Sequence, residues 1–222
     1  MLPTPQTALT QRVWDLPTRV FHLLLIFCVV NGWVSHLYFI EASAWHQFNG
    51  TLLLSLLLWR LIWGFVGSTT SRFSHFLHNP LKILRYLRGD TSIALPVGHN
   101  PLGGISVVVM LLLLLLQSSS GLFTTDDIFY TAPLNHWISS EIAATVTSLH
   151  KQIYWLLLAF IGLHLGAILV YTLRGKPLIK AMINGTMAIT TPLPQPLHFS
   201  ATWLALLIWL LIAAPLLYLL MW

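Results

Sequence analysis

The sequence has little charge and almost no cysteine. Only 8% of its 222 residues are charged, whereas 56% are hydrophobic, and a soluble domain of this length would need far more charge to cover its surface. The single cysteine, Cys28, excludes disulfide bonds within the chain. It also excludes a cysteine-ligated iron–sulfur cluster and covalent haem attachment through a CxxCH motif. The sequence is therefore dominated by its apolar runs.

Five apolar runs are long enough to cross the hydrocarbon core of a membrane, which takes about 20 residues of helix. They lie near Val20–Phe39, Trp45–Val66, Gly103–Phe123, His150–Tyr171 and Trp203–Met221. The first run is too long, and at Asn31, Ser35 and His36 too polar, to be a cleaved signal peptide. We therefore predict an all-α fold, a transmembrane helical bundle with a four-helix core and a fifth, C-terminal transmembrane helix.

The position of the charges predicts which way the chain crosses the membrane. Basic residues gather at the N-terminus and after the second and fourth runs, so the positive-inside rule places these parts in the cytoplasm. The net charge of +5 therefore indicates contact with a lipid bilayer and no nucleic-acid partner. The basic residues are Arg12, Arg19, Arg60, Arg72, Lys82, Arg85, Arg88, Arg174, Lys176 and Lys180, and the opposite side has Glu41, Asp126, Asp127, Glu141 and Lys151.

The segments outside the runs are short. We expect a disordered lead over 1–12, a membrane domain over 13–187, a Pro-rich linker over 188–199 and the extra transmembrane helix over 200–222. Phe73–Leu87 mixes apolar and basic residues, which predicts an amphipathic segment at the membrane surface, broken near Pro80. Most tryptophans fall near the predicted interfaces, where we expect them to form aromatic belts.

Histidines within the runs carry the functional argument, because an imidazole buried in lipid costs free energy unless it is paired or ligating. His150 and His164 lie 14 residues apart on the fourth run. With a rise of ~1.5 Å and a rotation of ~100° per residue, they are about 21 Å apart along the helix and about 40° apart around it. They share one face, with one near each side of the bilayer, as two stacked haems would require.

Each of these histidines needs a partner at the same depth on another helix. His22, at the start of the first run, is level with His164, and His46, at the start of the second, is level with His150. His36 is an alternative to His46, since it lies near the outer end of its run. Two neutral imidazoles on the two faces of an iron leave no position for a substrate, and such a site transfers electrons.

Arg60 and His99 are further candidates near the inner level. Arg60 lies 14 residues beyond His46 and so on nearly the same helix face, where its fork of donors would suit a propionate of the inner haem. The alternative is that Arg60 extends to the inner headgroups. His99 either orders the cytoplasmic loop or contacts a haem edge, and the sequence leaves both open.

Six segments point to a known family. They are VWDLPTRVFH (Val13–His22), WHQFNG (Trp45–Gly50), RLIWGFVGS (Arg60–Ser68), GHNPLGG (Gly98–Gly104), HKQIYWLLLAFIGLH (His150–His164) and MINGTM (Met182–Met187). Together they resemble the bacterial cytochrome b561 and nickel–iron hydrogenase b-type cytochrome family. The resemblance implies a four-helix core with two haem b groups, ligated by His22, His46, His150 and His164, and it favours His46 over His36.

The same resemblance implies a place in a respiratory chain of the bacterial inner membrane. Electrons would pass between the quinone pool and a periplasmic partner, either a c-type cytochrome or a dehydrogenase or hydrogenase subunit, and a bound quinone is a further expected ligand. The chain would then be an electron-transfer subunit and not a stand-alone enzyme. One alternative is a membrane anchor that tethers a redox enzyme. Another is a histidine-lined proton or metal transporter, which would need acidic residues within its spans, and the five runs have none.

Overall fold

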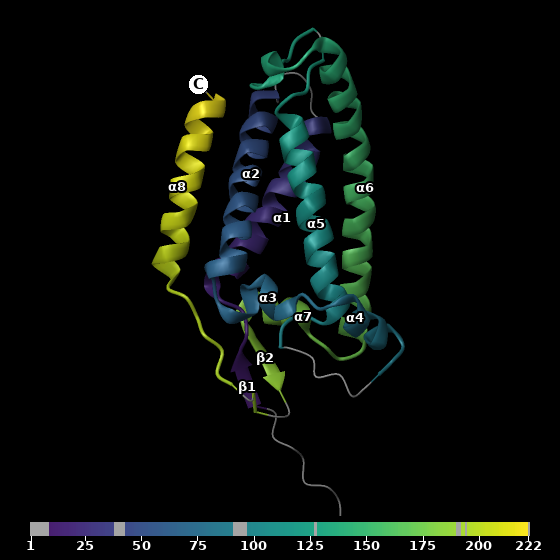
Figure 1. Ribbon diagram of the computed structural model, residues 1–222, viewed down its shortest axis with the longest axis vertical. Helices are drawn as coiled ribbons and strands as arrows, with labels where there is room; N and C mark the ends of the chain where they lie inside the picture. The colour runs from purple at the N-terminus through teal and green to yellow at the C-terminus, as the bar shows by residue number, and fades with distance from the viewer. Residues whose placement is uncertain are drawn as a thin grey trace, which may run out of the picture.

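The computed structural model describes residues 9–37, 43–90, 97–126, 128–189, 192–193 and 195–221, without the side chains of His36 and Ser43. Within these residues, five long helices run side by side as one bundle (Figure 1), and each is long and apolar enough to span a membrane. The prediction of an all-α transmembrane bundle is confirmed. The helices are α1 (Leu16–Leu37), α2 (Ser43–Val66), α5 (Pro101–Gly121), α6 (Ser140–Leu173) and α8 (Thr202–Met221).

Helix α2 is the central element of the bundle. It packs against α1, α5 and α8, whereas α6 packs mainly against α5. About 61% of the apolar stretch of α2 is buried, compared with 11% of that of α6. Leu57 and Trp63 of α2 are completely buried, whereas Leu163 and Leu173 of α6 are more than two-thirds exposed. The apolar surface that the outer helices present suits lipid as its surroundings.

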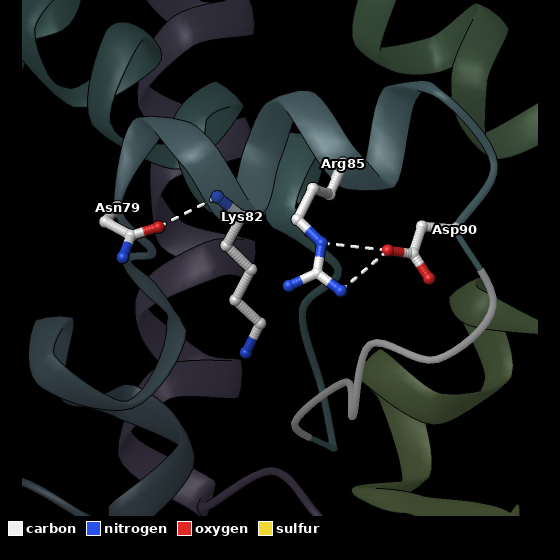
Figure 2. Close-up of polar contacts among 4 residues, drawn as sticks. All are labelled: Asn79, Lys82, Arg85 and Asp90. Atoms are coloured by element: carbon white, nitrogen blue, oxygen red, sulfur yellow. Dashed lines mark hydrogen bonds and ion pairs between the residues drawn. The ribbon is translucent and has the colours of Figure 1, made fainter.

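The segment that follows α2 has the predicted form of a broken amphipathic helix. It consists of α3 (Phe73–Phe76) and α4 (Pro80–Leu87). The side-chain oxygen of Asn79 accepts the backbone N–H of Lys82 at 2.8 Å (Figure 2). Pro80 takes the first helical position, where a backbone donor is not needed. On the exposed side of α4, the guanidinium of Arg85 pairs with Asp90 at 2.7 Å. The break near Pro80 is confirmed.

Helix α6 begins earlier than the sequence predicted. The side chain of Ser139 accepts the backbone N–H of Ile142 and so caps the helix, which starts at Ser140 and continues without interruption to Leu173. The predicted start at His150 was wrong because the preceding residues have no helix breaker, although they are too polar to count as a membrane span. His150 therefore lies well inside a continuous helix.

The predicted disordered lead was wrong for its last four residues. Leu9–Arg12 form β1, which pairs antiparallel with β2 (Thr186–Ile189), and residues 1–8 lie outside the described residues. Before β2, Gly185 has a φ of 81°, a conformation that glycine adopts readily. Its carbonyl oxygen accepts the N–H of Val13 at 2.8 Å. This contact aligns the two strands, so β2 also takes up the beginning of the predicted linker.

The two ends of the bundle differ in charge. What we call the basic end has the start of α1, the β1–β2 pair, α3, α4 and α7 (Leu178–Asn184), and the opposite, acidic end has the loop between α5 and α6 (Figure 1). Glu41 and Asp127 lie outside the described residues. The segments at the basic end contain Arg12, Arg19, Arg72, Lys82, Arg85, Arg88, Arg174, Lys176 and Lys180, and those at the acidic end contain Asp126 and Glu141.

A buried polar cluster joins α1 to α2 at the basic end. Asp15, which is 1% exposed, precedes α1, and one of its carboxylate oxygens accepts the backbone N–H of Thr18 at 2.8 Å. The other oxygen accepts the indole N–H of Trp63 and the hydroxyl of Ser71, both at 3.1 Å. Because a buried carboxylate requires such donors, Asp15 fixes the start of α1 against the end of α2.

Helix α8 packs along α2 and is joined to it by side-chain hydrogen bonds. The indole of Trp59 donates to the carbonyl oxygen of Ala205 at 2.9 Å, and the indole of Trp209 donates to the hydroxyl of Ser55 at 3.2 Å. The aromatic-belt prediction was wrong for Trp59 and Trp63, which are 4% and 0% exposed. Both indoles find acceptors inside the bundle, which explains how they can be buried there.

Replacement of Asp15 by alanine tests the buried cluster. The change leaves the indole of Trp63 and the hydroxyl of Ser71 without their acceptor, and we expect the free energy of unfolding to fall by about 3 kcal/mol. The matched control is Asp90→Ala, which breaks an exposed ion pair and should cost less than about 1 kcal/mol. Thermal unfolding of the detergent-solubilised variants measures both, and equal losses would contradict the importance of the cluster.

Candidate functional site

Two histidines from different helices face each other in the half of the bundle next to the acidic end. The ring centres of His46, on α2, and His150, on α6, are 6.4 Å apart, and the ring planes differ by 81°. A bond between a metal and an imidazole nitrogen is about 2 Å long, so two imidazoles on opposite sides of one metal have ring centres roughly 6 Å apart. The separation thus suits a metal ion between the rings. The side chain of His36 lies outside the described residues.

Polar groups from neighbouring helices surround this pair. The hydroxyl of Ser35, on α1, lies 2.9 Å from Nδ1 of His46, and the hydroxyl of Ser120, on α5, lies 3.0 Å from Nδ1 of His150. The side-chain amide nitrogen of Gln117 lies 3.1 Å from Nε2 of His150. These contacts were not predicted from the sequence. The available signal was the presence of isolated polar residues within runs that are otherwise apolar.

A second pair lies in the half of the bundle next to the basic end. His22 of α1 and His164 of α6 are both half-buried and lie in this half of their helices. Nδ1 of His22 is buried and has no hydrogen-bond partner. Since α6 is continuous, His164 and His150 share one face of it at two levels. The structure therefore brings His46 and His150 together and places His22 and His164 in the opposite half of the bundle.

Arg60 lies inside the bundle and does not extend to the headgroups. It is 3% exposed, and its Nη2 donates to the carbonyl oxygen of Ser71 at 3.0 Å. The guanidinium carbon lies 5.2 Å from the ring centre of Phe73. Nη1 is buried without a hydrogen-bond partner, which is costly unless an acceptor is supplied. The alternative of a headgroup contact was wrong, and the unsatisfied donor fits a carboxylate such as a haem propionate.

His99 packs within the loop that precedes α5. Its ring centre lies 4.8 Å from that of Trp14 and 4.6 Å from that of Phe76. Burial, together with the charges of Arg60 and His75, lowers the pKa of His99 to about 3, so the imidazole is neutral at physiological pH. These contacts support the interpretation that His99 orders the loop.

The segments that resemble the b-type cytochromes meet mainly at the basic end. Trp14 and Asp15 come from the first of them, Trp63 from the third and His99 from the fourth. Gly104, at the end of the fourth, lets α5 approach α3, because an added Cβ would lie only 2.7 Å from the carbonyl oxygen of Phe76. Much of the family pattern thus holds the helix ends in place.

The donor set fits a metal held in a macrocycle better than a free ion. Among the residues that the structure describes, no group of three or more histidine, cysteine, aspartate or glutamate side chains could hold a metal ion. The histidines come in pairs, and a pair can supply the two axial ligands of an iron whose other four ligands belong to a porphyrin. The spacing of His46 and His150 and the buried donor of Arg60 both agree with haem.

A multi-pass helical bundle in which two histidines of different helices face each other is the arrangement expected of a membrane cytochrome b. The comparison with family models agrees, since the model described as prokaryotic cytochrome b561 matches residues 13–185. The chain belongs to the prokaryotic cytochrome b561 family, and the resemblance found in the sequence is confirmed. No curated protein and no solved structure matches the chain. As a member of this family, it is a membrane cytochrome that binds b-type haem and transfers electrons.

Proposed function

We propose that the chain transfers electrons between the quinone pool and a periplasmic redox partner through two haem b groups. His46 and His150 would ligate the outer haem, and His22 and His164 the inner one. The observation that carries the proposal is that one continuous helix, α6, presents His150 and His164 along one face, and that His46 from another helix faces the first of them. Histidines that acted singly within the membrane would not need to lie at the same depth as a histidine of another helix.

The residues of the chain would hold the haems and keep water away from them. An iron with two imidazole ligands supplies reversible one-electron oxidation and reduction and has no position for a substrate. The two levels are about 21 Å apart along α6. Buried apolar residues of α2 and α5, among them Leu53, Leu57 and Leu114, form the core of the bundle. They provide an environment of low polarity, in which the free energy of a change of charge on a haem would depend strongly on nearby groups.

The orientation of the protein follows from its charges. With the basic end in the cytoplasm of a bacterium, as the positive-inside rule requires, the N-terminus is cytoplasmic and the pair His46–His150 lies near the periplasmic side. At the acidic end, the backbone N–H groups of Tyr130, Ile128 and Phe129 lower the pKa of Asp126. Asp126 therefore keeps its negative charge and favours a partner with a basic surface, such as a c-type cytochrome or the subunit of a dehydrogenase or hydrogenase.

Alanine replacements of the four histidines test the ligand assignment. Loss of His46 or His150 should remove one haem, loss of His22 or His164 should remove the other, and the haem content of the purified protein should fall by about half, because one imidazole holds haem weakly. The matched controls are His136→Ala and His198→Ala, which should keep both haems. Reduced-minus-oxidised spectra measure the outcome, and full pigment in the double variant His150→Ala, His164→Ala would exclude the assignment.

A second experiment, on membranes that contain the wild-type cytochrome, distinguishes electron transfer from a role as an anchor. Addition of a reduced quinone should produce the reduced spectrum of the wild-type cytochrome. An anchor in which haem does not exchange electrons with quinone would leave the spectrum oxidised, although haem is bound.

Replacement of Arg60 by leucine tests its proposed contact with a propionate of the inner haem. The loss of a buried positive charge should stabilise the oxidised haem and lower the midpoint potential of the inner haem by tens of millivolts, since a tenfold change in a one-electron equilibrium is ~59 mV. The Arg60→Lys variant keeps the charge and should recover most of the potential. Redox titration measures the shift, and an unchanged inner potential in Arg60→Leu would remove this contact from the account.

A further inference from the structure

Each histidine of the outer pair has a serine hydroxyl on its Nδ1, and in each case the serine belongs to a neighbouring helix. Ser35 of α1 lies 2.9 Å from Nδ1 of His46 on α2, and Ser120 of α5 lies 3.0 Å from Nδ1 of His150 on α6. Ser35 is 7% exposed. The two contacts are alike in geometry although they come from different parts of the sequence.

The hydrogen bonds of the serines fix the direction of both contacts. The hydroxyl of Ser35 donates to the carbonyl oxygen of Gly32 at 3.1 Å, and that of Ser120 donates to the carbonyl oxygen of Gln117 at 3.0 Å. A hydroxyl has a single hydrogen and two lone pairs. Each serine oxygen therefore accepts a hydrogen bond from the histidine, and the proton of each imidazole is on Nδ1.

The side chain of Gln117 agrees with this assignment for His150. Its amide nitrogen, which can only donate, lies 3.1 Å from Nε2 of His150. With the amide placed this way, Nε2 of His150 is the acceptor nitrogen, and the amide oxygen of Gln117 is buried without a hydrogen-bond partner. A lone pair on Nε2 is what a metal ligand requires, while the Nδ1–H of a metal-bound histidine commonly donates to an outer acceptor.

We propose that Ser35 and Ser120 are positioning residues that lower the midpoint potential of the outer haem. Each serine would hold its histidine ring through Nδ1, so that Nε2 is the nitrogen left to ligate an iron. By accepting the Nδ1–H hydrogen bond, it also raises the basicity of the ligand, which stabilises the oxidised iron. This inference rests on the proposed function, because it assigns a property to the outer of the two proposed haems.

The inner pair lacks the equivalent contact at His22. Nδ1 of His22 is buried without a hydrogen-bond partner, so no hydroxyl strengthens this imidazole as a ligand. Two haems that each have two histidine ligands would then differ in midpoint potential, and the outer haem would have the lower one. An electron shared between the two haems would then be favoured on the inner one, although the two sites are otherwise similar.

The experiment is a redox titration of the full-length protein with Ser35→Ala and Ser120→Ala. The outer haem is identified as the one that is lost in His46→Ala. Each serine variant should raise the outer midpoint potential, by up to about tenfold in the redox equilibrium or ~59 mV, and should leave the inner one unchanged. Ser118→Ala is the matched control, because its hydroxyl donates to the carbonyl oxygen of Leu114 in its own helix, at 2.8 Å.

The conservative variants Ser35→Thr and Ser120→Thr keep a hydroxyl and should restore the wild-type potential. A selective loss of the outer haem in the alanine variants, restored by threonine, would also support the proposal. It is overturned if the alanine variants bind two haems with potentials like those of Ser118→Ala, or if the outer potential falls. A wild-type protein without haem would instead refute the proposed function itself, so the two failures are distinguishable.

Discussion

The cost of placing an imidazole inside an apolar bundle is the constraint on which the account depends. Each histidine within the spans requires a partner, and α6 has two, His150 and His164, on one face of a helix that continues without a break from Ser140 to Leu173. That spacing sets the levels of both proposed sites. The residues of α1 and α2 can complete the sites only where they reach the same depths, as His46 does at 6.4 Å from His150.

The contacts that fix the depth of each helix in the bundle lie at the basic end, away from the outer pair. Asp15 links the start of α1 to Trp63 at the end of α2, and Asn100 starts α5 by accepting the backbone N–H of Gly103 at 2.7 Å. Because helices are stiff, a fixed end determines the height of every residue above it. The family segments thus act together: some would supply ligands, and the others hold the helices at the heights at which the ligands meet.

The sequence predicted the fold well because long apolar runs with almost no charge have few other structures open to them. Helix geometry also converts spacing into depth, and His46 and His150, predicted at one depth, do face each other. Prediction from the sequence missed β1 because four residues, three of them polar, after a Pro-containing stretch have no pattern of their own and form a strand only beside β2. It missed Asp15, Ser35 and Ser120 because their partners come from other helices, and single polar residues do not reveal which neighbour they contact. Arg60 was placed at the correct level, but its burial and its contact with Ser71 depend on tertiary packing.

The most direct test of the central claim is the number of haem groups held by each purified chain. The protein would be expressed with an ample supply of haem, and the pyridine haemochrome would be measured against the protein concentration. Two levels of paired imidazoles predict two haem b groups per chain. A colourless protein, or one that saturates at a single haem, would contradict the account.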